Sequence, residues 1–127
     1  MSEQPKQRMK SYEMIPDRIK KRYLDFYDEL YHPERSAIDL KTKELIAIAA
    51  SVAMDCKGCF RGHVLKAVRA GATQEEVGEA IAIAIAISGA AIVDRTDIVN
   101  EQYDLVQSLW GKDRKNGVNG DDDETTP

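Results

Sequence analysis

The chain has 127 residues, of which 43% are hydrophobic and 31% are charged, and its formal net charge is -4. This length suits one domain with its own core and is too short for two domains of ordinary size. Because the sequence has no run of lysine and arginine with interleaved aromatic residues, nothing in it favours phosphate neutralisation, and we expect no nucleic-acid partner.

The two ends of the chain differ in composition from its middle. Residues 1–14 contain no apolar signal segment, and residues 111–127 include the acidic run Asp121–Glu124 with almost nothing apolar to bury. We therefore expect a flexible arm over 1–14, one domain over 15–110 and a disordered acidic tail over 111–127. No stretch reaches the ~18 apolar residues of a membrane helix, so we also expect a cytoplasmic protein without a membrane partner.

The first half of the domain shows two helical patterns. Pro16 suits the first turn of a helix that ends near His32-Pro33. Asp39 is a suitable N-cap for a second helix, which runs to Ala53 and contains Glu44. The apolar stripe of the first helix consists of Ile19, Tyr23, Phe26, Tyr27 and Leu30.

Two further helices follow. A third helix is expected to begin around Cys56 and to end at Gly71, because glycine readily adopts the left-handed backbone that closes many helices. The run Thr73-Gln74-Glu75-Glu76 has the pattern of a capping box and predicts the start of a fourth helix. The fold class that these patterns indicate is all-α, a compact bundle of about five or six helices.

The fourth segment carries conflicting signals, because residues 80–87 alternate alanine and isoleucine, a period that alone favours a strand. We predict a helix, since the capping box precedes it and a single strand would have no partner. Such a helix is apolar all round, so we expect it at the centre of the bundle or in a subunit interface of a homo-oligomer. We expect a break at Ser88-Gly89 and a last helix whose apolar positions run from Ile98 to Trp110.

The only two cysteines of the chain lie in the motif Cys56-Lys57-Gly58-Cys59. Two sulfurs at this spacing can close a disulfide across one helical turn, which favours a redox dithiol. The alternatives are a zinc site, in which His63 and either a carboxylate or His32 complete the ligands, and inert buried thiols. Structural zinc usually takes four Cys or His ligands, and the chain has two of each. We therefore favour the redox dithiol and expect no metal or cofactor.

Neighbouring residues suit the activation of these thiols. Cys56 at a helix start lies near free backbone N–H groups, which favour a thiolate. Cys59 and His63 are four residues apart on one helix, so the imidazole can reach the second sulfur, and Glu44 can orient the imidazole. Alternatively, His63 is an ordinary helix histidine and Glu44 pairs with Lys41 or Lys43 at the surface. These arguments leave open which cysteine is the nucleophile.

Three segments carry a family resemblance: Lys43–Ala49, Cys56–His63 and Ala70–Val77. They resemble the carboxymuconolactone decarboxylase superfamily, in its alkylhydroperoxidase D-like branch. The resemblance spans about Leu40 to Val93. The pattern of a glutamate, eleven residues, Cys-x-x-Cys, three residues and a histidine is specific to that branch.

The resemblance implies an all-helical fold that assembles as trimers or hexamers, and a peroxidase or disulfide reductase that needs no metal or haem. By position, Cys59 is implied to attack the peroxide, His63 and Glu44 to relay the proton, and Cys56 to close the disulfide. The implied substrate is a small hydroperoxide or disulfide, and a lipoyl or thioredoxin-like dithiol is the implied reductant.

Two other functions compete with this interpretation. The same thiols can belong to a non-enzymatic helical oligomer that responds to oxidants or zinc. The other branch of the superfamily decarboxylates a lactone carboxylic acid and generally lacks the Cys-x-x-Cys motif. A decarboxylase-like enzyme with incidental cysteines is therefore the weaker alternative.

Overall fold

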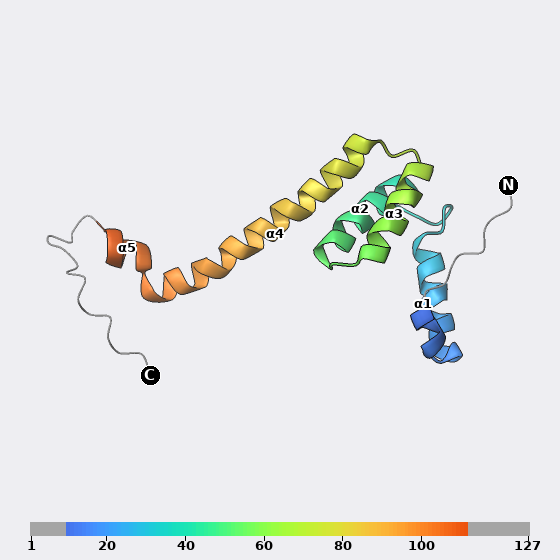
Figure 1. The fold of residues 1–127 in the computed structure, drawn as a ribbon, viewed down its shortest axis with the longest axis horizontal. Coiled ribbons are helices and arrows are strands. Elements are labelled where there is room, and N and C mark those ends of the chain that lie inside the picture. Colours follow the sequence, from blue (N-terminus) through green and yellow to red (C-terminus); the bar gives the residue numbers. More distant parts are fainter. Residues whose placement is uncertain (1–9, 112–127) are drawn as a thin grey trace. The chain divides into compact units, whose positions relative to one another are not determined.

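The computed structural model describes residues 10–111, and that part of the chain contains helices and no strand, which confirms the predicted all-α class. Figure 1 shows the chain from the N-terminal to the C-terminal helix. The elements are a 3-10 helix (Lys10–Met14), α1 (Asp17–Leu30), α2 (Leu40–Ala53), α3 (Lys57–Arg69), α4 (Gln74–Tyr103) and α5 (Leu105–Trp110). The rest of the predicted arm and the tail beyond Gly111 lie outside the described residues.

The helix boundaries follow local chemistry that the sequence predicted. Asp39 caps α2, with its carboxylate accepting the Thr42 backbone N–H at 3.0 Å. Thr73 and Glu76 form the capping box of α4, because Glu76 accepts the Thr73 N–H at 2.8 Å and Thr73 Oγ1 accepts the Glu76 N–H at 3.1 Å. Gly71 follows α3 with a φ of 95°, the left-handed conformation expected there.

The chain divides after Ala84 into two compact units, and the first unit holds the core. Within it, α2 and α3 lie side by side (Figure 1). Ile48 of α2 and Ala67 of α3 are both fully buried, and the start of α4 adds Ala80. The partly buried residues around them are Leu45, Phe60, Val64, Val77 and Ile81. This small core fixes α2 against α3.

A tight turn joins these two helices. Asp55 adopts the left-handed conformation with a φ of 54°, which aspartate tolerates better than most residues. The turn is closed by the Cys56 backbone N–H, which donates to the Ser51 carbonyl at 2.9 Å. The start of α3 is thereby tied to the last turns of α2.

The predicted break at Ser88-Gly89 is wrong, because α4 runs unbroken from Gln74 to Tyr103. An interior glycine costs a helix only about 1 kcal/mol relative to alanine, and the neighbouring residues are good helix formers. The chain breaks instead at Asp104, which has a left-handed φ of 47°. The predicted last helix is therefore split, with Ile98 in α4 and Trp110 in α5.

Of the two places expected for α4, the centre of the bundle is not the one it takes within the described part of the single chain, and the subunit interface stays a prediction. Only Ala80 and Ala84 of this helix are buried, whereas Ile85 is 65% and Ile87 is 66% exposed. The physical reason is length, because α4 has 30 residues and α2 and α3 have 14 and 13. At 1.5 Å per residue, neither shorter helix can cover it.

By length and hydropathy, α4 is the one helix within residues 10–111 that could cross a membrane, which the sequence analysis did not anticipate. Its most apolar window of 18 residues has a mean hydropathy of 1.8. However, the stretch without a charged residue covers only 80–93, between Glu79 and Asp94. A span needs about 20 predominantly apolar residues, so the stretch without charge is shorter than a usual span.

Candidate redox site

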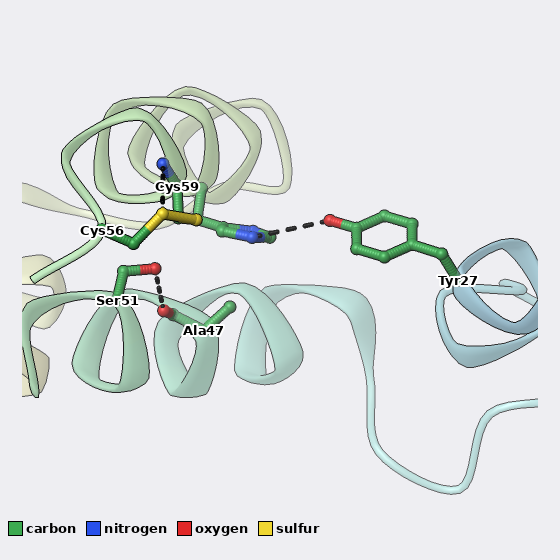
Figure 2. Close-up of a disulfide and its surroundings, with 6 residues drawn as sticks. Tyr27, Ala47, Ser51, Cys56 and Cys59 are labelled. Carbon is green, nitrogen blue, oxygen red and sulfur yellow. Dashed lines mark hydrogen bonds between the residues drawn. A yellow bond between two sulfur atoms is a disulfide. The ribbon is translucent and has the colours of Figure 1, made fainter. Parts of the chain in front are cut away.

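A disulfide joins Cys56 and Cys59 at the N-terminus of α3, with the two Cα atoms 5.2 Å apart. Cys56 is the N-cap residue, and its Sγ accepts the backbone N–H of Cys59 at 3.3 Å (Figure 2). Both cysteines are half-buried. The backbone N–H that contacts Cys56 would also stabilise a thiolate there after reduction.

Ser51 lies next to the disulfide in Figure 2 and connects it to α2. Its hydroxyl donates to the Ala47 carbonyl at 2.6 Å, within the same helix. Its own carbonyl accepts the Cys56 N–H, and the residue is buried. Ser51 therefore holds the first cysteine through the backbone, and its hydroxyl bonds Ala47 rather than the sulfur.

Glu44 and His63 form a buried pair between α2 and α3. Glu44 Oε2 lies 2.6 Å from His63 Nδ1, and the two side chains are only 7% and 12% exposed. A carboxylate only accepts hydrogen bonds, so Nδ1 carries a hydrogen, and in the neutral form of the ring Nε2 is then the nitrogen with the lone pair. Since His63 is one turn after Cys59, this basic nitrogen belongs to the same helix as the second cysteine.

The alternative in which Glu44 pairs with a surface lysine is wrong. Lys41 Nζ donates to Glu76 at 2.8 Å, which ties α2 to the start of α4. Lys43 donates to Ser36 Oγ at 2.7 Å and to the Leu30 carbonyl. Glu44 turns away from both lysines and bonds His63.

The zinc site considered from the sequence is not assembled in the part of the chain that the structure describes. Between residues 10 and 111, no group of three or more His, Cys, Asp or Glu side chains could hold a metal ion. His32 Nδ1 instead accepts the backbone N–H of Glu34 at 3.2 Å. The two cysteines are joined to each other and His63 Nδ1 is bonded to Glu44.

A contact from α1 completes the surroundings of His63, and the sequence analysis missed it. Tyr27 Oη lies 3.5 Å from His63 Nε2, and Figure 2 shows its hydroxyl pointing toward the side where Cys59 lies. Lys66 Nζ donates to the same hydroxyl at 3.3 Å. Donors and acceptors thus run in one direction, from Lys66 through Tyr27 and His63 to Glu44.

Tyr31 adds a second aromatic ring to this group. Its ring stacks on that of His63 with centroids 6.0 Å apart, and the Lys66 ammonium lies 5.3 Å from the Tyr27 centroid and 5.8 Å from that of Tyr31. Burial raises the pKa of both tyrosines, and the charge of Glu44 acts in the same direction. Both hydroxyls are therefore protonated at neutral pH and can donate.

The sequence did contain a weak signal for these residues. Tyr27 and Tyr31 are four residues apart on α1, where the apolar stripe could have held leucines, and Lys66 follows His63 by three positions on α3. Residues at these spacings share a helix face. No local pattern, however, shows that the two faces meet.

A cavity of about 460 Å³ opens beside this group in the first unit. Small-molecule sites commonly have volumes of ~300–1,000 Å³. The side chains that line it combine rings and apolar groups with charged groups of both signs. They are Tyr27, Asp28, Tyr31, His32, Pro33, Leu40, Glu44, Lys66, Arg69 and Ala70.

Comparison with known proteins gives a family match over most of the domain. Residues 18–99 match the sequence model of the carboxymuconolactone decarboxylase family. This range contains Glu44, both cysteines and His63, together with Tyr27. It covers more than half of the chain.

The chain is also similar to individual proteins. A stretch of 48 residues is 48% identical to "uncharacterized protein 4 in cox locus" of Paracoccus denitrificans, covering 38% of the chain and 43% of that protein. The chain thus spans less than half of that relative. A crystal structure from Methanobacterium thermoautotrophicum is 27% identical with a TM-score of 0.64, covering 71% of this chain and 98% of the other.

A second solved structure comes from Thermotoga maritima. It is a carboxymuconolactone decarboxylase family protein with a suggested part in the antioxidative response. It is 27% identical with a TM-score of 0.54, and the match covers 75% of this chain and 96% of that one. Both structures are matched over nearly their whole length.

Proposed function

Because the chain belongs to the carboxymuconolactone decarboxylase family, we propose that it is a thiol-dependent oxidoreductase whose Cys56–Cys59 dithiol reduces organic hydroperoxides. The observation that carries the proposal is a disulfide one helical turn from a histidine whose Nδ1 is bonded to a buried glutamate. Membership alone does not choose a reaction, since the family is named for a decarboxylase. The proposed redox function rests on the side chains of Cys56, Cys59, His63 and Glu44.

The proposed oxidation begins with the reduced protein. His63 Nε2 takes the proton of the Cys59 thiol, and Glu44 stabilises the imidazolium through Nδ1. The thiolate then attacks the terminal oxygen of the hydroperoxide, so that a sulfur–oxygen bond forms and the oxygen–oxygen bond breaks. The alkoxide that leaves takes the proton back from His63 and becomes an alcohol. Cys59 is left as a sulfenic acid.

Cys56 completes this half of the cycle. Its thiolate attacks the Cys59 sulfur, a sulfur–sulfur bond forms, and the hydroxide that leaves takes up the Cys56 proton to give water. Two thiols and one hydroperoxide thus yield one disulfide, one alcohol and one water. The backbone N–H of Cys59 lies within hydrogen-bond distance of the Cys56 sulfur, which favours its thiolate form.

An external dithiol must then reduce the disulfide by thiol–disulfide exchange, and a lipoyl or thioredoxin-like partner suits this step. The same exchange run with a small disulfide substrate would make the protein a disulfide reductase. We also propose that the chain works as a homo-oligomer, such as a trimer or hexamer. The support for this is the exposure of Ile92, Ile98 and Trp110 on the second unit, at 62%, 66% and 75%.

Peroxide consumption by variants with one cysteine replaced tests the proposal. With dithiothreitol as the electron donor, we expect the wild type to consume tert-butyl hydroperoxide continuously and Cys59→Ser to consume none above background. The matched variant Cys56→Ser keeps the attacking thiol and should consume one equivalent rapidly before it slows. Full turnover by Cys59→Ser would move the nucleophile to Cys56, and turnover by a variant without either cysteine would end the proposal.

A further inference from the structure

We propose that Tyr27 is a catalytic donor to the oxygen that leaves the hydroperoxide, and that Lys66 strengthens this donor. The inference rests on the proposed peroxidase function and adds α1 to a site otherwise built from α2 and α3. It begins with the position of the Tyr27 hydroxyl, 3.5 Å from His63 Nε2.

The reaction produces negative charge close to that hydroxyl. When the oxygen–oxygen bond breaks, its electron pair goes to the leaving oxygen, which must lie near Nε2 to take the proton from His63. An oxygen that lies beside the contact between His63 and Tyr27 can accept hydrogen bonds from both the protonated His63 Nε2 and the Tyr27 hydroxyl. Donors already oriented toward developing charge lower a barrier without reorganising during the reaction.

The state of Tyr27 suits a donor. Burial raises its pKa, and Glu44 adds to this effect, so the hydroxyl keeps its hydrogen at neutral pH. Lys66 donates to the same oxygen at 3.3 Å. A cation that donates to a hydroxyl oxygen polarises the O–H bond and makes it a stronger donor. Among the ion pairs of the described residues, none involves Lys66, so its charge is directed at the two rings and this hydroxyl.

The cavity gives the rest of the leaving group a place to bind. Tyr27, Glu44 and Lys66 all line it, so the cavity adjoins residues that contact His63, although His63 itself does not line it. Tyr31, Pro33 and Leu40 give it apolar walls. An alkoxide whose oxygen accepts from Tyr27 can therefore extend its organic part into this space, away from the disulfide.

The test compares oxidants whose leaving groups differ in basicity. Reduced wild type and Tyr27→Phe are mixed with peracetic acid, cumene hydroperoxide or tert-butyl hydroperoxide, and the rate of disulfide formation is measured. A donor to the leaving oxygen matters most for a basic alkoxide and least for acetate. We expect Tyr27→Phe to lower the rate of disulfide formation with tert-butyl hydroperoxide about 10–100-fold. The loss should be smaller with cumene hydroperoxide and almost absent with peracetic acid.

Two controls separate this role from a structural one. Tyr23→Phe removes a hydroxyl from the same helix, one turn away, and should match the wild type with all three oxidants. Alkylation of Cys59 by iodoacetamide forms no leaving oxygen, so its rate in Tyr27→Phe should equal that of the wild type. If alkylation and all oxidations slow by the same factor, Tyr27 serves thiolate formation or the fold, and the proposal is wrong.

Lys66 acts through Tyr27 and is a positioning residue. Lys66→Met should show the same dependence on the leaving group as Tyr27→Phe with a smaller loss, and Lys66→Arg should restore most of the rate. The outcomes also separate the two proposals. A wild type inert to all three oxidants overturns the peroxidase function, whereas a reactive wild type that Tyr27→Phe matches with every oxidant overturns only the role of Tyr27.

Discussion

The two units of the chain use their apolar side chains in opposite ways. In the first, Ile48 and Ala67 are fully buried, and the polar residues Glu44 and Ser51 are buried with hydrogen-bond partners. In the second, Ile85, Ile98 and Trp110 are each at least 65% exposed. The disulfide and the pair of Glu44 and His63 therefore lie within the first unit, while the later turns of α4 and α5 carry apolar side chains that the described residues leave exposed. The proposed chemistry and the proposed assembly thus rest on different segments of the sequence.

The largest effect should come from the base of the proposed relay. His63→Gln keeps a polar side chain but removes the proton acceptor, and we expect Cys59 oxidation at neutral pH to slow about 10²–10⁴-fold. The loss should shrink as pH rises above the ordinary thiol pKa of ~8.5, because the thiol then ionises without help. The control is His32→Gln, which replaces the other histidine. Stopped-flow measurement of disulfide formation across pH tests this, and equal rates for both variants would contradict it.

The next effect concerns the core beneath the site. Ile48→Ala leaves a cavity where α2 meets α3 and should lower the free energy of unfolding by about 2–5 kcal/mol. Ile46→Ala, on the same helix but 54% exposed, should cost much less. Urea denaturation at one protein concentration compares them. Equal losses would mean that Ile46 is covered in solution and that the first unit also contributes to assembly.

Substitutions in the second unit should change the mass of the assembly more than the rate of thiol oxidation. Ile92→Asp introduces a charge on the exposed apolar part of α4 and should dissociate the proposed oligomer toward the 14.2 kDa monomer. Thr96→Asp adds the same charge one turn later at an already polar position and should dissociate it less. Light scattering coupled to size exclusion measures both. A monomeric wild type would contradict the assignment of this surface to assembly.

The smallest effect is a pH dependence at the junction of α2 and α4. The bond with Lys41, followed by the Thr73 backbone N–H, lowers the pKa of Glu76 below its usual 4.5. A depressed carboxylate pKa stabilises the fold above that value, and the contribution is lost as the pH falls through the lower, folded-state pKa. Glu76→Gln should therefore flatten the loss of stability in acid. Glu75→Gln should not flatten this loss. If the free energy of unfolding of the two variants falls identically in acid, the ion pair of Glu76 with Lys41 does not contribute to stability.

Local patterns in the sequence predicted much of the first unit. The helix ends at Asp39, Gly71 and Thr73 lie where they were expected. Caps and left-handed turns depend on residues that are close along the chain, so local patterns predict them. The cysteine pair followed for the same reason, since three positions span one helical turn. The proximity of Glu44 to His63 was also predicted, and in the structure the turn at Asp55 brings the two helices that carry them back together.

What the sequence did not predict depends on longer distances or on competing preferences. The contact of Tyr27 with His63 needs the orientation of α1 against α3, which no spacing within one helix specifies. Ser88-Gly89 was expected to break α4, but the cost of one glycine is small against the helix-forming residues on both sides. The real break at Asp104 carries no glycine or proline and gave no comparable signal.

The most direct test of the central claim is mass spectrometry of alkylated thiols in reduced, chelator-treated protein, before and after one equivalent of cumene hydroperoxide. The account predicts that Cys56 and Cys59 both take up the alkylating reagent before oxidant and neither does afterwards, with the peptide two hydrogens lighter and the peroxide converted to its alcohol. If both cysteines still alkylate fully and the peroxide persists, the pair does not act as a peroxide-reducing dithiol and the account is contradicted.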